Sequence, residues 1–470
     1  MGHSECYSNL YLLAIFLFTF WLRGDTLYLE VDKRLSRNPG DRYAFLNKRF
    51  DTAVFLRWEI PALILVQFLT NAGYLATSIT YLFDLVNIIL LIFNAKRVSG
   101  FFRQHNGYSL LLICYCLLAI ASGLGGGVSP LCITWELISQ LRIPLYILLV
   151  SAFWTIDDLE SVLRFLFRIQ PLNVAFALVE YFVFNLTGDC CGGLFGIDAG
   201  SNMLLNMYLV FVSSIACCGY LSGVKSSQGA LSFASTLVGS FFVATLAEIK
   251  FFYFEAAVII IIAVLLGKKS AKMATAIALF VAACLVGLSA LAVYFPDSYD
   301  MLFDSNQMLS YDDGSNVATS GYGISRFGAI SQIDELFFHG DTLDQVVGFG
   351  FGSATMSSID QFCSPFYWTY GWLRYYYSQI AMLYLQNGYV GLAIYFALML
   401  MPCLFAVLKR KVLESLGGRF WLTFTVAVTV LFVMNCFYNA SSRSYAALLW
   451  AVCLAAPFLV SQKGEDNAIR

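Results

Sequence analysis

Four basic residues in unusual surroundings are the strongest candidates for chemistry in this sequence. Arg142 lies in the apolar run ISQLRIPLYILLV, Lys250 in the turn LAEIKFFYFEAA, and Arg326 and Arg374 in the acidic segment 296–378. A charged group in hydrocarbon costs about 2.5–3.5 kcal/mol on insertion scales, so it usually marks a functional site or a pair between helices. Arginine binds phosphate oxygens through two parallel hydrogen bonds. If the four cations converge, they form a site for an anion such as a diphosphate.

Two acidic residues also fall within apolar runs. Glu180 lies in FALVEYFVFNL and Asp84 in YLFDLVNIILL. Each is either a functional carboxylate or one half of a pair between helices. Glu136 precedes Arg142 by six residues, a spacing that does not place the two on one face of a helix. The partner of Arg142 therefore stays open.

The motifs of metal-dependent and nucleotide-dependent enzymes are absent. The sequence has no Walker loop, no GxSxG elbow, no HExxH and no CxxC, and it contains only 3 histidines. Asp312 and Asp313 could bind a cation, but the context SYDDGSN is more typical of a turn. We therefore expect no metal, no cofactor and no nucleic-acid partner. A disulfide from Cys363 to Cys190 or Cys191 is open, because all three fall in loops predicted to share one side.

The composition indicates what must position these residues. Of the 470 residues, 59% are hydrophobic and 12% are charged, whereas a soluble domain carries about 25% charged residues. This predicts an all-α polytopic membrane protein, in which each crossing needs about 20 apolar residues. The run 9–22 is either a further span or an interfacial helix, which gives about 12–13 transmembrane helices. The twelve clear candidates are 54–73, 76–95, 107–124, 131–153, 170–187, 202–222, 230–248, 251–267, 273–295, 379–408, 419–438 and 443–461.

The distribution of Lys and Arg predicts the orientation. Basic loops precede the first span and follow the second, fourth, sixth, eighth and tenth, while the alternate loops are nearly free of Lys. Because basic loops stay in the cytoplasm, the alternate loops face outward. Segment 296–378, with nine Asp and one Glu against two Arg, becomes a large extracytoplasmic loop. The chain then divides into an N-terminal extension (1–52), a first transmembrane bundle (53–295), this loop, and C-terminal transmembrane helices with a short tail (379–470).

The loop contains the segment GFGFG, with Gly348, Gly350 and Gly352. A dinucleotide-binding glycine loop needs a preceding strand, a following helix and a cytosolic cofactor. An outward-facing loop meets no such cofactor, so this interpretation is excluded. We expect the glycines to let backbone approach a ligand or a neighbouring helix closely.

The order of these features resembles the O-antigen polymerase and O-antigen ligase superfamily over roughly residues 54 to 461. Four stretches carry the resemblance: GGLFGIDAGSN, LAEIKFFYFEAAVIIII, SRFGAISQIDELFFHGDTLDQVVGFGFGS and SQIAMLYLQNGYVGLAIYF. They are similar, in order, to an outer loop that opens a middle span, an outer turn with a basic residue, an R…GxGxG stretch in a large outer loop, and the entry into a late span.

The resemblance implies a GT-C-like, metal-independent glycosyltransferase in the bacterial cytoplasmic (inner) membrane. Such an enzyme joins undecaprenyl-diphosphate-linked repeat units into O-antigen, capsule or exopolysaccharide on the outer face of that membrane. By the resemblance, Arg326, Lys250 and Arg142 would hold the diphosphate, with Arg374 as a further cation, and the GFGFG loop would shape the cavity. Membrane lipids, a chain-length regulator and a flippase are the partners that it implies.

The sequence departs from the family at one informative point. Where ligases usually carry His-Asn at the head of the late span, this chain has Ser378–Gln379. The difference favours a polymerase over a ligase and removes the obvious catalytic base. Asp334, Glu335 and His339 remain as candidates for that role. A ligase of the same superfamily and a secondary transporter or flippase are the alternative functions.

Overall fold

The structure is a computed structural model that describes residues 51–222, 229–268, 270–304, 323–417 and 419–461. Residues from Ala53 onward form one compact unit. Within the described ranges the chain forms helices and turns and no β-strand. The run 9–22 and the pair Asp312–Asp313 lie outside these ranges. The prediction of an all-α protein is therefore confirmed for the part of the chain that is described.

The long helices carry most of the apolar sequence. Eight helical stretches are long and apolar enough to cross a membrane: Thr52–Asn71, Asn106–Gly125, Pro130–Phe153, Ile156–Phe182, Ser201–Ser222, Ala271–Tyr294, Gln379–Leu408 and Phe420–Tyr438. A ninth is added if Thr77–Phe93 and Ala95–Gln104, which meet at 81°, are one span. Three shorter apolar helices cover Ala230–Leu246, Phe251–Leu266 and Tyr445–Ser461. A polytopic membrane protein accounts for this set.

Each of the twelve predicted spans is helical over most of its length, but not all are long enough to count as crossings by themselves. The helices at 230–248 and 251–267 contain 17 and 16 residues, and a crossing takes about 20. The helix expected at 170–187 ends at Phe182 and continues from the preceding helix, so the two together form one stretch of 27 residues. Within the described residues, eight or nine of the twelve predicted spans thus have the length of a crossing, and the other three are shorter apolar helices.

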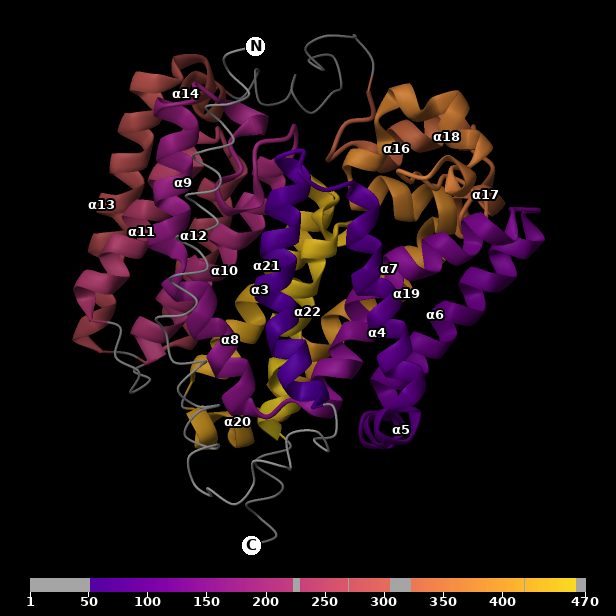
Figure 1. Ribbon diagram of the computed structural model, residues 1–470, viewed down its shortest axis with the longest axis horizontal. Helices are drawn as coiled ribbons and strands as arrows, with labels where there is room; N and C mark the ends of the chain where they lie inside the picture. The colour runs from indigo at the N-terminus through magenta and orange to yellow at the C-terminus, as the bar shows by residue number, and fades with distance from the viewer. Residues whose placement is uncertain (1–50, 223–228, 269, 305–322, 418, 462–470) are drawn as a thin grey trace, which may run out of the picture. The chain divides into compact units, whose positions relative to one another are not determined.

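The helices bear the following bounds in Figure 1: α3 (Thr52–Asn71), α4 (Tyr81–Phe93), α5 (Ala95–Gln104), α6 (Asn106–Gly125), α7 (Pro130–Phe153), α8 (Ile156–Arg168), α9 (Gln170–Phe182), α10 (Ser201–Ser222), α11 (Ala230–Leu246), α12 (Phe251–Leu266), α13 (Ala271–Tyr294), α14 (Pro296–Phe303), α16 (Ala329–Ile333), α17 (Thr342–Val347), α18 (Pro365–Tyr370), α19 (Gln379–Leu408), α20 (Arg410–Gly417), α21 (Phe420–Tyr438) and α22 (Leu448–Leu454).

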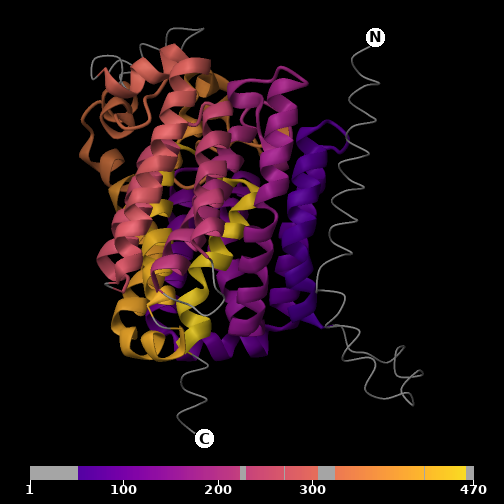
Figure 2. The same cartoon turned by 90° about the vertical axis from the view of Figure 1, so that its left-hand side faces the viewer.

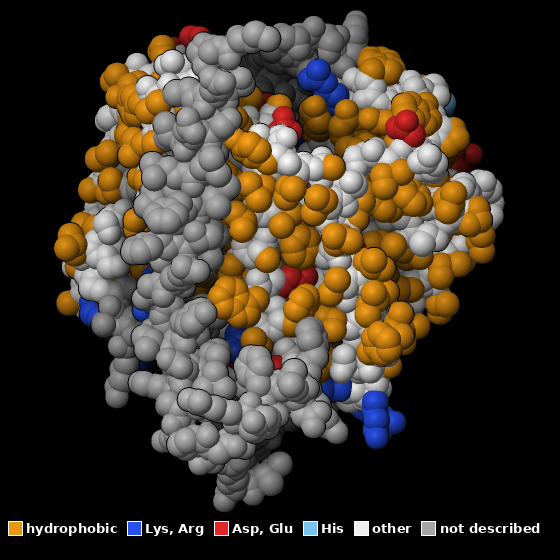
Figure 3. Space-filling model, in the orientation of Figure 1, with side chains coloured by type: hydrophobic (Ala, Val, Ile, Leu, Met, Phe, Trp, Pro, Cys, Tyr) orange, Lys and Arg blue, Asp and Glu red, His pale blue; other side chains and the backbone are white. Residues whose placement is uncertain are grey.

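The two ends of the bundle differ in the elements that they carry. Figure 2 shows the long helices running side by side along one direction, with short helices gathered at the upper end. The basic helices α5 and α20 lie at the lower end, and α14, α16, α17 and α18 lie at the upper end (Figure 1). Orange side chains cover much of the flank between them (Figure 3). Leu285 and Leu117 are 58% and 63% exposed there, which suits side chains that face lipid.

The described part of segment 296–378 consists of short helices and turns, and its glycine-rich stretch is wedged between long helices. Gly348, Gly350 and Gly352 have φ of 69°, 95° and 86°. A Cβ on these glycines would lie 2.5, 2.6 and 2.9 Å from backbone atoms of α19, α6 and α7, respectively. Only glycine has both the backbone conformation and the space for this position. The glycines therefore serve the close approach of neighbouring helices.

The helix α19 is interrupted next to that stretch. Gly388 has non-helical angles, φ 55° and ψ −159°, within the run Gln379–Leu408. The amide of Phe349 donates to the carbonyl of Leu385 at 2.9 Å, and the amide of Gly352 donates to Oε1 of Gln386 at 3.0 Å. The glycine loop thus binds the first half of α19 just before the break.

Candidate functional site

The upper end of the bundle brings together two of the four predicted cations. Lys250 precedes α12 in the turn that follows α11, and Arg326 precedes α16. Burial lowers the pKa of Lys250, the charge of Arg326 lowers it further, and Glu248 and Asp189 act in the opposite direction. The rings of Phe251, next to Lys250, and Phe327, next to Arg326, have centroids 6.3 Å apart, so the two turns that carry the cations are neighbours. Both side chains are half-buried.

Aromatic rings support this pair of cations. The guanidinium carbon of Arg326 lies 4.4 Å from the ring centroid of Tyr438, at the end of α21. Phe251, the residue after Lys250, stacks on the same tyrosine with centroids 4.1 Å apart and planes at 10°. A cation over an aromatic face gains electrostatic energy from the ring. We call Lys250, Arg326, Phe251 and Tyr438 the outer cation group.

A buried polar pair lies next to the aromatic rings of this group. One turn below Phe251, the carboxylate of Glu255 is fully buried and accepts a hydrogen bond of 2.8 Å from Nδ2 of Asn206. A polar layer therefore continues beneath the aromatic rings.

Arg142 lies in a different environment. Its Nε and Nη2 donate to the two carboxylate oxygens of Asp84 at 2.8 and 2.7 Å. Its Nη1 donates to the carbonyls of Arg443 and Ser444, the latter at 3.1 Å. The ring centroid of Tyr445 lies 4.1 Å from its guanidinium carbon. The structure thus gives Arg142 and Asp84 the structural pairing that the sequence left open, and the side-chain donors of Arg142 are occupied.

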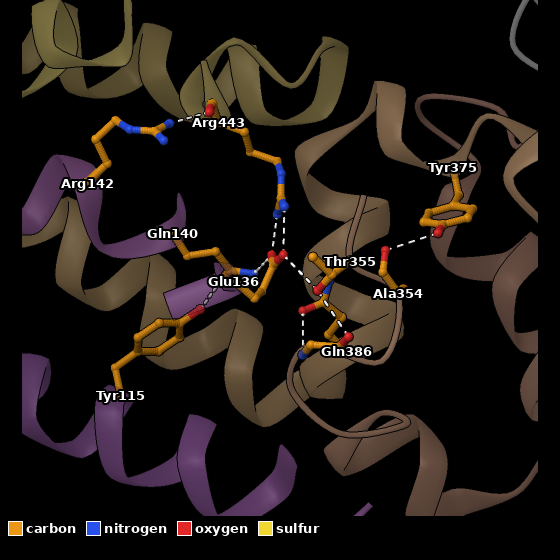
Figure 4. Close-up of polar contacts among 10 residues, drawn as sticks. Tyr115, Glu136, Gln140, Arg142, Ala354, Thr355, Tyr375, Gln386 and Arg443 are labelled. Carbon is orange, nitrogen blue, oxygen red and sulfur yellow. Dashed lines mark hydrogen bonds and ion pairs between the residues drawn. The ribbon is translucent and has the colours of Figure 1, made fainter. Parts of the chain in front are cut away.

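A second buried ion pair joins α7 to the turn between α21 and α22. Arg443 donates to both carboxylate oxygens of Glu136, from Nη2 at 2.7 Å (Figure 4). Gln140 donates to the same carboxylate at 2.6 Å, and Thr355 donates to it at 3.1 Å. Glu136 is fully buried. Because Thr355 belongs to the segment after the glycines, this pair also anchors the upper short helices to the bundle.

A backbone hydrogen bond joins the stretches that precede Arg326 and Arg374. The amide of Ile324 donates to the carbonyl of Leu373 at 2.9 Å, so the stretches that lead to Arg326 and Arg374 run side by side. Arg374 has φ 54°, and its guanidinium carbon lies 5.8 Å from the Tyr377 ring centroid. It is half-buried.

The three candidate bases follow α16: Asp334 and Glu335 lie in the π-helical turn Asp334–Phe338, and His339 comes directly after it. Asp334 is half-buried and accepts a hydrogen bond of 2.6 Å from the hydroxyl of Tyr384. Glu335 and His339 are exposed, and His339 has a left-handed backbone with φ 48°. The tyrosine bond makes Asp334 the one of the three that is held in place by another side chain.

Ser378 and Gln379 lie against the end of α21. The hydroxyl of Ser378 donates to the carbonyl of Phe437 at 3.3 Å, and the amide of Gln379 donates to the carbonyl of Asn439 at 3.2 Å. Both side chains are buried. The two residues therefore adjoin Tyr438, on whose ring Arg326 lies.

Glu180 is also buried, and it accepts a hydrogen bond of 2.7 Å from the amide of Gly193. It thus holds the turn that follows α9. Cys190, Cys191 and Cys363 are unbridged. Among the described residues, no group of three or more His, Cys, Asp and Glu side chains could hold a metal ion.

Arg443 is the residue that sequence reasoning missed. It lies in the polar stretch NASSRSY between two apolar runs, and the predicted span 443–461 absorbed it. The signal was present, because five of the six residues from Asn439 to Ser444 are polar. Asn439 and Ser442 are buried in the structure, so this turn lies inside the protein.

Comparison with known proteins identifies no family for this chain. No protein-family model matches the chain, and no curated protein matches it.

Proposed function

We propose that this protein is a repeat-unit polymerase of the bacterial cytoplasmic membrane. It transfers an oligosaccharide from one undecaprenyl-diphosphate carrier to a second lipid-linked repeat unit on the outer face. The products are surface polysaccharides such as O-antigen, capsule or exopolysaccharide. A GT-C-like arrangement and a chain-length regulator and a flippase as partners are part of the same proposal.

The outer cation group is the observation that carries the proposal. Arg326 lies over the ring of Tyr438, and Phe251, the residue after Lys250, stacks on the same ring. A polyanion bound by both cations would gain charge-assisted hydrogen bonds, each contributing about 1.5–3 kcal/mol. A diphosphate on a lipid tail has both the charge and the access from the membrane. Arg142 has no part in this site, because Asp84 and backbone carbonyls occupy its donors.

The chemistry requires no metal in principle. A hydroxyl oxygen of the acceptor sugar forms a bond to the anomeric carbon of the donor, and the bond from that carbon to the diphosphate oxygen breaks. Lys250 and Arg326 would stabilise the charge that develops on the leaving diphosphate. The hydroxyl proton passes to a carboxylate base, for which Asp334 is the best-held candidate because Tyr384 orients it.

The test is the Arg326→Ala variant in the host strain. We expect it to abolish long-chain surface glycan while the protein still inserts in the membrane, and Arg326→Lys to retain part of the activity because it keeps the charge. Arg410→Ala is the matched control: its exposed pair with Glu414 contributes little, so its glycan should be normal. Normal long-chain glycan in the Arg326→Ala strain would refute the assignment.

A transporter is the second candidate, and the broken helix α19 favours it. Discontinuous helices beside buried polar groups often form substrate sites in transporters, and Gly388 breaks α19 next to the buried Gln386 and Asn387. Purified protein in liposomes separates the functions. A flippase moves lipid-linked glycan across the bilayer without lengthening it, whereas a polymerase lengthens it. A ligase, the other alternative, is recognised in cells, where its loss would leave polymer on the lipid carrier.

A further inference from the structure

The first residue of α19 carries a buried side chain whose hydrogen-bonding groups are unused. Gln379 is 1% exposed, and neither its Nε2 nor its Oε1 has a hydrogen-bond partner among the described residues. A buried polar group without a partner is costly, and more than nine-tenths of such groups in proteins have one. A primary amide in this position therefore lowers the stability of the fold.

A second amide lies beside it. Asn439 is 5% exposed, and its backbone carbonyl accepts the hydrogen bond from the amide of Gln379. Its Oδ1 accepts a hydrogen bond of 2.8 Å from the amide of Ser441, while its Nδ2 has no partner in the described part of the chain. Two neighbouring amides thus offer two N–H donor groups and one acceptor oxygen with no use inside the protein.

The position of the two amides ties them to the outer cation group. Asn439 follows Tyr438, whose ring lies under Arg326 and is stacked on Phe251. Ser378, the residue before α19, does not cap the helix with its side chain, because its hydroxyl donates to the carbonyl of Phe437 instead. Gln379 and Asn439 are thus joined to each other at the end of α21, directly after the tyrosine that Arg326 contacts.

We infer that Gln379 and Asn439 form a binding subsite for the uncharged part of the substrate, in which their amides bind sugar hydroxyl groups. This inference rests on the proposed function, since it assigns the diphosphate to the cations and the sugar to the amides. A sugar hydroxyl both donates and accepts, so it can pair with the Oε1 of Gln379 and with either amide nitrogen.

The experiment measures melting temperatures of the full-length protein in detergent micelles, with and without two probes. Inorganic diphosphate tests the cations, and methyl glucoside, an uncharged sugar, tests the amides. We expect each probe to raise the melting temperature of the wild-type protein. Gln379→Leu should lose the shift with methyl glucoside and keep the shift with diphosphate, while Arg326→Ala should show the reverse.

Gln379→Leu also tests whether the side-chain amide of Gln379 serves binding or folding. Removing an unpaired buried amide should raise the melting temperature of the ligand-free protein by roughly 2–4 °C. Gln140→Leu is the matched control, because Gln140 is also buried but is bonded to Glu136 and Tyr115. That variant should melt at a lower temperature than the wild type. In cells, Gln379→Leu should reduce polymer formation by roughly tenfold or more.

The failures of the two proposals are distinct. A wild-type protein that methyl glucoside does not stabilise, or a Gln379→Leu variant that melts lower than the wild type, overturns the sugar subsite. If ordered water is the sole partner of the amides, methyl glucoside will not stabilise the wild-type protein. A diphosphate shift that survives in Arg326→Ala overturns the role of the cations and leaves the sugar subsite standing.

Discussion

At the scale of single residues, the buried pair Glu136–Arg443 is the contact whose loss should be most visible. Glu136 alone would be a fully buried charge and Arg443 a half-buried one, and the pair links α7 to the turn after α21. Breaking a buried ion pair from one side costs about 3–5 kcal/mol, whereas replacing both partners by apolar residues is often neutral or stabilising. Comparing single and double variants therefore distinguishes the ion pair from ordinary packing contacts.

We therefore expect Glu136→Leu and Arg443→Met each to lower the free energy of unfolding by about 3–5 kcal/mol, and the double variant to recover most of that loss. Arg410→Met, which cuts the exposed pair with Glu414, should cost about 1 kcal/mol or less. Chemical unfolding in micelles, followed by tryptophan fluorescence, gives the free energies of the four variants. Additive losses in the double variant would contradict a direct coupling of the two side chains.

At the scale of elements, the glycine stretch is a structural wedge. Its backbone fills the space between α6, α7 and the first half of α19, and at its three glycine positions there is no room for a Cβ atom. A cofactor-binding loop would be exposed to its ligand. In this stretch, by contrast, Phe351 between the last two glycines is fully buried. The wedge therefore sets where the upper short helices dock.

Gly350→Ala tests the wedge. Its Cβ would lie 2.6 Å from the carbonyl oxygen of Ser122, and its φ of 95° is unfavourable for alanine. Gly340→Ala is the matched control, because Gly340 has φ 80° but nothing within 4 Å of a Cβ. The control should cost about 1–2 kcal/mol of unfolding free energy from backbone strain alone, and Gly350→Ala a further ~1–3 kcal/mol from overpacking. Equal losses in the two variants would show that the backbone angle alone matters.

At the scale of the whole molecule, the two ends of the bundle should face opposite sides of the membrane. The basic helices α5 and α20 lie at one end and the short helices of segment 323–378 at the other (Figure 1). The positive-inside rule then predicts that the end with α20 faces the cytoplasm.

Cysteines introduced at exposed positions test this orientation. Trp368→Cys, in α18, should react with a membrane-impermeant maleimide in intact cells, since Trp368 is 61% exposed. Lys411→Cys, in α20, should react only after the membrane is permeabilised, since Lys411 is also exposed but lies at the opposite end. Labelling of the wild-type protein gives the background from native cysteines. The reverse pattern would place the outer cation group in the cytoplasm and remove the basis for the proposed function.

The sequence by itself determined the class of the protein, the positions of its helices and which loops share an end of the bundle. Hydropathy and loop charge are local properties, so a window of about 20 residues contains what decides a crossing. The exact ends of α9, α11 and α12 differ from the predicted ones because they depend on the turns that these helices enter.

Only the tertiary structure decided which charges meet. Arg142 pairs with Asp84 across 58 residues of sequence, and Arg443 pairs with Glu136 across 307. Arg326 and Phe251, the residue after Lys250, come from two loops that no local pattern connects, and both contact the ring of Tyr438. A charge in an apolar run signals that some partner must exist, since burial without one is too costly. Which group supplies that partner depends on how the helices pack.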